Sequence, residues 1–325
     1  MSGVSNQIQT PFGTGVRTAV GLAAGAAGGI TEMPANPNFA ATGTVYGTMF
    51  SVWQAANIIA GGGYSTPYTV GNYNGANANG AGVSFPTITA IDFGSIQILR
   101  NAFTGSLLTY TSITANSLFQ ISSDFNIIAG SVTTLSMPNL QYIGGVLNSA
   151  MNTLPTFSLP ALLAVNANFG ATSTGTTAIS MPLLSYIGGA FAPNFAALTS
   201  VDFSGLQYIG NNISFTSTSL ATLNFPALIT VVTTIQAITA NLVNFSMGST
   251  LKSVGGNFTI TGAKLNQASV DGILVSLAAL DGTSGTTAYS GFTVNLSGGT
   301  SSAPSATGLT AKTTLQGRGC TVTTN

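Results

Sequence analysis

The sequence predicts a mainly β protein: a single-chain β-solenoid closed at its C-terminal end by a small α/β cap. Three observations carry this prediction. One pattern of apolar and short polar residues recurs every ~22 residues, and prolines and glycines recur at fixed positions within it. The apolar residues of one such unit are too few to form a core alone, so the units must stack on one another.

The repeat is visible in two similar decapeptides, SMPNLQYIGG at 136–145 and SMPLLSYIGG at 180–189, which lie two periods apart. We call Ser136 and its equivalents in the other repeats position zero. Only short polar residues occupy it: Asp92, Thr114, Ser136, Ser158, Ser180, Asp202, Asn224 and Ser246. Apolar residues flank position zero on both sides, and further apolar columns follow at positions four, seven and eleven. The eighth repeat slips by one residue.

Each part of the unit predicts a local structure. Alternation in Leu135-Ser136-Met137 predicts a short strand. Proline recurs at position two, and because proline cannot donate to a β-ladder the strand should end there. Those prolines are Pro138, Pro160, Pro182 and Pro226. Paired glycines at 144–145, 188–189 and 255–256 are expected to supply a positive-φ corner. Eight coils at strand spacing would form a rod roughly 35–40 Å long.

The C-terminal cap is predicted from a change of pattern. Residues 265–281 have apolar residues at helical spacing, with Asn266 or Ser269 as the N-cap. A strand is expected at 292–299, a second helix at 305–317 and a last strand at 320–325. This unit would cover the last coil of the solenoid, whose apolar columns and strand edges would otherwise be exposed.

The segment 1–85 does not follow the repeat and is rich in turn residues. We therefore divide the chain into an N-terminal arm and cap (1–85), an eight-coil solenoid (86–262) and an α/β cap (263–325). The pattern at 45–60 predicts a helix or a pair of strands over the first coil. Two interpretations of the whole segment stay open: an arm that docks onto a larger particle, or a flexible leader followed by a cap.

The composition excludes several functional classes. Six basic and six acidic residues make up 4% of the chain, against roughly 25% in an average soluble domain. No basic face is available for nucleic acid or for an anionic membrane. The chain has no histidine and one cysteine, Cys320, so we expect no metal and no cofactor. We also expect no transmembrane helix and no secretion signal, since the apolar run at 16–30 is made of small residues.

Carboxylate pairs are the remaining catalytic option, and the sequence disfavours them. Glycosidases place two carboxylates about 5–9.5 Å apart. The acidic residues are Glu32, Asp92, Asp124, Asp202, Asp271 and Asp281. No two of them fall on adjacent coils in one column, and Asp92 and Asp202, five coils apart, would be about 24 Å apart. We expect these two to join polar ladders, and we expect no enzyme activity.

Three tyrosines are the candidate contact residues. Tyr142, Tyr186 and Tyr208 lie one position before an inward apolar column, so their side chains should point outward. Tyr186 and Tyr208 are on adjacent coils and should stack about 5 Å apart. One interpretation is that the rings bind a sugar or a partner subunit; the other is that they shield the coil corner or pack against the next turn.

The repeat region resembles a known family. LTTLSMPNLQYIGG and LTSVDFSGLQYIGNNISF are similar to the leucine-rich repeats of receptor L domains and related bacterial surface repeats, over residues 86–262. The resemblance implies a right-handed β-solenoid of leucine-rich-repeat type that supplies a binding surface. LSGGTSSAPSATGLTAKTTLQGRGCTVTTN resembles a C-terminal module of bacteriophage structural proteins and bacterial surface proteins.

These observations together predict a non-enzymatic surface protein of a phage virion, either a tail fibre or adhesin or a capsid decoration. We expect its partners to be other virion proteins, reached through the N-terminal region, and a host surface glycan or protein. Nucleic acid and membrane insertion are not expected, and homo-oligomerisation is left open. The alternative is a bacterial extracellular adhesin or surface-layer component; a polysaccharide depolymerase is the less favoured third.

Overall fold

The structure, a computed structural model, describes residues 68–69, 90–92, 98–99, 103–105, 111–128 and 130–325. The helix or strand pair expected at 45–60 lies outside the described residues, as does the rest of the segment 1–85 apart from residues 68–69. We describe the architecture for these ranges only.

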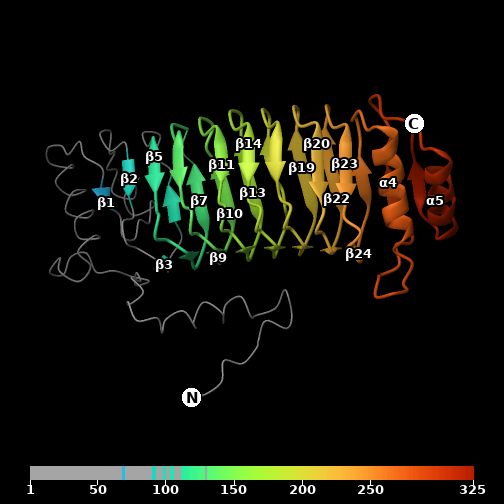
Figure 1. Ribbon diagram of the computed structural model, residues 1–325, viewed down its shortest axis with the longest axis horizontal. Helices are drawn as coiled ribbons and strands as arrows, with labels where there is room; N and C mark the ends of the chain where they lie inside the picture. Colours follow the sequence, from blue (N-terminus) through green and yellow to red (C-terminus); the bar gives the residue numbers. More distant parts are fainter. Residues whose placement is uncertain (1–67, 70–89, 93–97, 100–102, 106–110, 129) are drawn as a thin grey trace, which may run out of the picture.

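The chain winds into a parallel β-solenoid of about seven turns with three strands in each coil (Figure 1). One coil consists of β8 (Thr134–Ser136), β9 (Tyr142–Ile143) and β10 (Leu147–Ala150). Each strand pairs in parallel with the corresponding strand of the next coil, one repeat further on, as β9 does with β12 (Ala164–Val165). The three strands of a coil define three faces, which we call the first, second and third face. The parallel β-solenoid predicted from the repeat is therefore confirmed.

The first face contains the strands at position zero, and it is divided into sheets of four, three and two strands. Besides β8, its strands are β1 (Tyr68–Thr69), β2 (Ala90–Asp92), β5 (Ser112–Thr114), β11 (Thr156–Ser158), β14 (Ala178–Ser180), β17 (Ser200–Asp202), β20 (Thr222–Phe225) and β23 (Asn244–Met247). β1 pairs in parallel with β2, so the column of strands extends into the segment 1–85.

The second face is one sheet of eight strands. Besides β9 and β12, its strands are β3 (Ile98–Leu99), β6 (Gln120–Ile121), β15 (Tyr186–Ile187), β18 (Tyr208–Ile209), β21 (Thr230–Val231) and β24 (Ser253–Val254). Thr230 pairs with Ser253 rather than with Lys252, which a repeat of constant length would place opposite it. The one-residue slip predicted for the eighth repeat is therefore confirmed.

The third face is a sheet of ten strands that runs on into the cap. Besides β10, its strands are β4 (Phe103–Gly105), β7 (Phe125–Ile128), β13 (Phe169–Ser173), β16 (Asn194–Phe195), β19 (Ile213–Ser217), β22 (Ile235–Thr239), β25 (Phe258–Ile260), β26 (Thr293–Asn295) and β27 (Thr321–Thr323). The last two strands continue the ladder without a repeat sequence.

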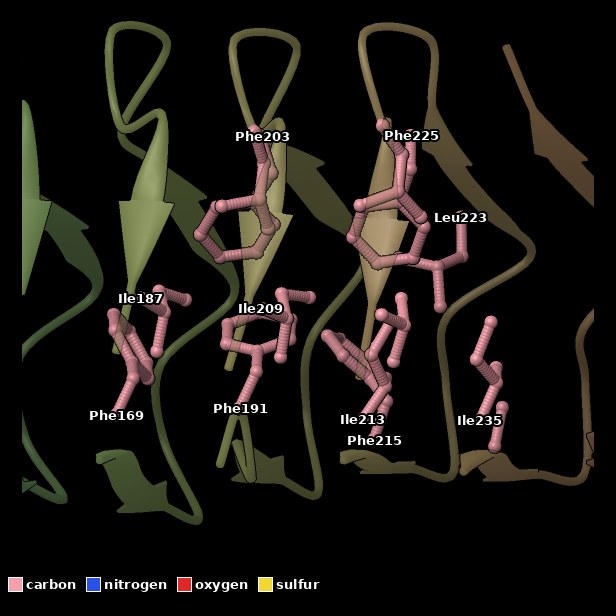
Figure 2. Close-up of a cluster of buried hydrophobic side chains, with 14 of the residues drawn as sticks. Phe169, Ile187, Phe191, Phe203, Ile209, Ile213, Phe215, Leu223, Phe225 and Ile235 are labelled. Carbon is pink, nitrogen blue, oxygen red and sulfur yellow. The ribbon is translucent and has the colours of Figure 1, made fainter. Parts of the chain in front are cut away.

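The core lies between the three faces and runs along the axis of the solenoid. All the predicted apolar columns point inward: Ile179, Met181, Leu184, Ile187 and Phe191 of one coil are each at most 1% exposed. Phenylalanines from neighbouring coils pack edge to face between the faces (Figure 2). The ring centres of Phe191 and Phe203 are 5.0 Å apart, a geometry that adds about 0.5–1.5 kcal/mol to simple burial.

Further inward columns escaped the sequence analysis. They lie at positions 13, 15 and 18 of the repeat, and they mix apolar residues with small or hydroxyl residues. Their buried members include Ile127, Ser149, Ala171, Phe215, Ala237, Met151, Ser173, Phe195, Ser217, Thr239, Val132, Leu154, Thr176, Leu198, Leu220 and Leu242. A buried hydroxyl can be satisfied at a corner: Thr176 Oγ1 donates to the carbonyl of Leu154, 2.7 Å away.

The prolines end strands as predicted, but the reason given for the paired glycines is wrong. Among the described residues, positive φ occurs at Ser284 and at glycines from Gly262 onward, and not at Gly144, Gly145, Gly188 or Gly189. A Cβ on Gly144 would overlap the carbonyl oxygen of Ser122 in the preceding coil. The glycines therefore allow close approach between coils rather than an unusual backbone angle.

The cap follows its prediction closely. α4 (Gln267–Ala278) begins after Asn266, whose side chain accepts a hydrogen bond from the N–H of Ser269. α5 (Ala306–Gly317) begins after Ser305 and lies beyond α4 at the end of the solenoid (Figure 1). Neither helix has the length and hydrophobicity needed to cross a bilayer, and within the described ranges no other helix does.

Candidate binding surface on the second face

The three predicted tyrosines lie in one column of the second face. Tyr142 is in β9, Tyr186 in β15 and Tyr208 in β18. Each is half-buried, and each precedes a buried isoleucine, so the tyrosines occupy the outward side of the strand. In register, Tyr142 is followed by Ala164, then by Tyr186 and then by Tyr208. We call these four positions the tyrosine ladder.

The structure brings two of the three tyrosines together. The rings of Tyr186 and Tyr208 are stacked, with centres 5.2 Å apart and planes 8° from parallel. The stacking predicted from coil spacing is therefore confirmed, and it contributes about 0.5–1.5 kcal/mol. Tyr142 lies two coils from Tyr186, on the other side of Ala164.

Two hydroxyls of the ladder are protonated through the neutral pH range. Burial raises the pKa of Tyr142 above its ordinary value of 10.0. Burial, and to a lesser extent the adjacent Tyr208, also raises the pKa of Tyr186. Both causes disfavour a phenolate, because a negative charge would lose water and would meet a second negative charge. These rings thus present an uncharged aromatic surface.

Side-chain amides accompany the rings, and the sequence analysis did not single them out. Gln141 precedes Tyr142, Gln207 precedes Tyr208, and Asn166 follows the Ala164 position by two residues; all three are half-buried. In the sequence these residues are marked only by their place at position five or eight of the repeat, and the residue type at both positions differs from coil to coil. They neighbour the ladder in the sequence, so the second face carries amide groups as well as aromatic rings.

The described carboxylates of the solenoid have structural partners. Asp202 lies in register with Ser180 of the preceding coil, as expected of a polar ladder, and its side chain accepts a hydrogen bond from the N–H of Ser204, 3.0 Å away. Asp124 Oδ1 accepts from the N–H of Val146 in the next coil at 2.7 Å. Asn168 makes the equivalent bond to Ala190 at 2.8 Å, so the role of Asp124 does not require a charge. Glu32 and the side chain of Asp92 lie outside the described residues.

The two carboxylates of the cap also hold backbone. Asp271 in α4 accepts hydrogen bonds from the N–H and the hydroxyl of Ser305, the N-cap of α5. Asp281 accepts from both the N–H and the hydroxyl of Thr283, and these bonds lower its pKa. Within the described part of the chain no three His, Cys, Asp or Glu side chains come together as a metal site.

Comparison of the chain with protein-family models, with curated proteins and with solved structures found no match. The fold and the surface chemistry therefore carry the functional argument by themselves.

Proposed function

We propose that this chain is a non-enzymatic surface protein of a phage virion, a tail fibre or adhesin or a capsid decoration, that presents a polar solenoid to a host or to another subunit. Its N-terminal region would attach it to other virion proteins. The described carboxylates support a role without catalysis, because each one serves as an acceptor for backbone or hydroxyl donors of the fold.

The observation that carries the proposal is the uncharged outer surface of a long parallel solenoid. From Ser136 to Asn212 the chain contains a single charged residue, Asp202, and that residue lies on the first face. An extended scaffold with repeated neutral side chains suits contact with another surface, since solenoids display binding positions at regular intervals.

Two resemblances give the proposal its finer form. The repeats are similar to leucine-rich repeats, so we propose a right-handed solenoid of that type, and the cap is similar to a module of phage structural and bacterial surface proteins. An experimental structure decides the type and the handedness. A left-handed winding would remove the leucine-rich-repeat assignment and would leave the parallel solenoid as it is.

The location is tested on particles. Cells that carry the gene are induced, and released particles are purified by density gradient and analysed by mass spectrometry and immunogold labelling. We expect the chain in the particle fraction, at a stoichiometry of several copies, with label on the outside. Its absence from particles, together with its presence in the cell envelope, would overturn the virion proposal in favour of a bacterial adhesin.

A further inference from the structure

The third face is the broadest of the three faces of the solenoid. Its strands reach five residues, as in β19 and β22, whereas every described strand of the second face contains two. Its sheet is continuous, whereas the first face is divided into three sheets. Because successive side chains of a strand lie on opposite sides of the sheet, the residues between the inward columns point outward.

The outward residues form two rows along the solenoid axis, at positions 12 and 14 of the repeat. From β7 to β22, row 12 contains Asn126, Asn148, Gly170, Ala192, Ser214 and Gln236. Row 14 contains Ile128, Ala150, Thr172, Asn194, Thr216 and Ile238.

Both rows have closely similar residues when they are read from either end. In row 14 the two isoleucines, Ile128 and Ile238, are the end residues, and each is 49% exposed. In row 12 the side-chain amides of Asn126 and Gln236 are at the ends. The two residues in the middle of row 12 are a glycine and an alanine, the smallest residue types. The third face is therefore close to a palindrome, whose centre lies between β13 and β16.

A palindromic face is complementary to a second copy of itself. A two-fold axis parallel to the strands, between β13 and β16, sets each row against the same row in reverse order. Ile128 of one copy then meets Ile238 of the other, and Asn126 meets Gln236. Gly170 meets Ala192, so nothing bulky separates the two sheets at the centre. An axis along the solenoid would instead set row 12 against row 14, with Ile128 facing an amide, so the antiparallel arrangement is favoured.

The size and charge of the face suit such a contact. The eight strands from β4 to β25, at about 4.8 Å spacing and about five residues each, cover roughly 600 Å² per copy. Two copies would bury roughly 1,200 Å² in total, above the ~1,000 Å² that a specific interface needs. Neither row contains a charged residue from β7 to β22, so no like charges would meet when the face packs on itself.

We propose that the third face is a homodimer interface, in which two copies of this chain pack antiparallel, sheet on sheet. Ile128 and Ile238 are the apolar contacts at its two ends, and the small residues at the centre let the sheets approach. This inference goes beyond the proposed function and does not depend on it, because a dimer of this kind could form on a virion or on a cell surface.

The test is sedimentation equilibrium of the purified full chain over a series of concentrations up to about 100 μM. Ile128→Asp and Ile238→Lys each place a charge at one end of the face. Val232→Lys is the matched control, because Val232 is also an exposed apolar residue, at 42%, but follows β21 of the second face. Thermal unfolding of each variant, followed by circular dichroism, checks that the solenoid is intact.

We expect a dimer for the unaltered chain and for Val232→Lys. Ile128→Asp and Ile238→Lys should each dimerise at least tenfold more weakly, since each leaves two unpaired charges in the interface. An equimolar mixture of these two variants should regain dimers, because the aspartate of one copy meets the lysine of the other while the remaining isoleucines still pair.

Three results would overturn the inference. The first is a monomer, or an oligomer larger than a dimer, for the unaltered chain. The second is a loss in Val232→Lys equal to the loss in Ile238→Lys. The third is a mixture that associates no better than its two components, which would exclude the antiparallel pairing of Ile128 with Ile238. None of these results bears on the particle experiment, so the two proposals fail separately.

Discussion

A corner of the solenoid and the contact between the two cap helices each need a glycine. In the solenoid the atom that leaves no room for a side chain belongs to the backbone, and in the cap it belongs to a side chain. At Gly144 the missing side chain makes room for the backbone carbonyl of Ser122, one coil away. At Gly308 in α5 it makes room for the carboxylate of Asp271 in α4. The solenoid contact recurs, since Gly188 meets the carbonyl of Asn166 in the same way. The cap contact occurs once.

This difference decides whether the contact can be predicted from the sequence. A backbone neighbour at the distance of one coil is the same in every repeat, so the glycine becomes a visible column. A side-chain neighbour from a distant helix leaves one glycine in a helix, which by itself looks like a weak helix former. The following predictions test this contrast, from the largest expected effect to the smallest.

Replacement of a corner glycine should have the largest effect. We expect Gly144→Ala to lower the free energy of unfolding by about 3 kcal/mol, because the backbone of the preceding coil cannot move aside without breaking its ladder. Urea denaturation followed by circular dichroism measures the change. Gly170→Ala in β13 is the matched control: a Cβ there meets no atom within 4 Å, so we expect no loss or a gain of about 0.4–1 kcal/mol. Equal losses at the two positions would contradict the steric argument.

The cap contact should be smaller and should show coupling. Gly308→Ala forces the Asp271 side chain away from Ser305 and should cost about 2 kcal/mol, and Asp271→Ala should cost about 1–2 kcal/mol through the lost N-cap support of α5. The double variant should be more stable than the sum of the two losses predicts, because the clash and the bond disappear together. Strict additivity in the same denaturation experiment would show that the two residues do not share this contact.

The stacked tyrosines should titrate together. In Tyr208→Phe we expect the pKa of Tyr186 to fall, and to stay above 10.0 because burial remains. The pKa of Tyr186 is higher in the folded chain than in the unfolded chain. The contribution of the neutral Tyr186 ring to the free energy of unfolding is therefore complete below pH 10.0, and it is lost as the pH rises through the folded pKa. NMR of ¹³C-labelled tyrosine follows the titration. Tyr142→Phe, two coils away, should leave the pKa of Tyr186 unchanged; an equal shift in both variants would refute a pairwise effect.

The smallest effect concerns the exposed loop after α4. Hydrogen bonds from Thr283, and then from Thr286, lower the pKa of Asp281 below its ordinary value of 3.8. Because the pKa of Asp281 is lower in the folded chain than in the unfolded chain, the carboxylate stabilises the loop fully at pH values above 3.8. This stabilisation is lost as the pH falls through the folded pKa. Asp281→Ala should therefore lower the melting temperature slightly at neutral pH and leave it unchanged in strong acid. A difference that persists unchanged in acid would exclude the carboxylate as its source.

Much of the architecture could be predicted from the sequence because it depends on repeated local rules. The inward columns, the strand ends before the prolines and the N-cap of α4 at Asn266 each follow from residue types at known spacing. The stacking of Tyr186 on Tyr208 followed from the coil spacing alone. The columns at positions 13 and 15 were missed because residues such as Ser149 and Ala171 do not look apolar or large enough to mark a core, whereas the column at position 18, with Leu154, Leu198 and Leu220, carries a clear apolar signal that could have been found.

The candidate surface was only partly visible in the same way. The tyrosines stand out as large residues at an outward position, whereas Gln141, Asn166 and Gln207 occupy positions where the residue type varies from coil to coil and so carry no signal of their own. The burial of Ala164 also could not be predicted from its residue type, because it depends on the side chains of the two neighbouring coils.

By itself the sequence determined the length of a coil, the residues that face inward and the ends of the strands, since each of these depends on residues within one unit and is repeated in the next. Tertiary structure decided why the corners need glycine and which polar groups meet. Asp124 reaches the N–H of Val146 only because Gly145 leaves that space empty. Partners that are one repeat apart in the chain become neighbours only when the coils stack, so their contacts belong to the folded solenoid.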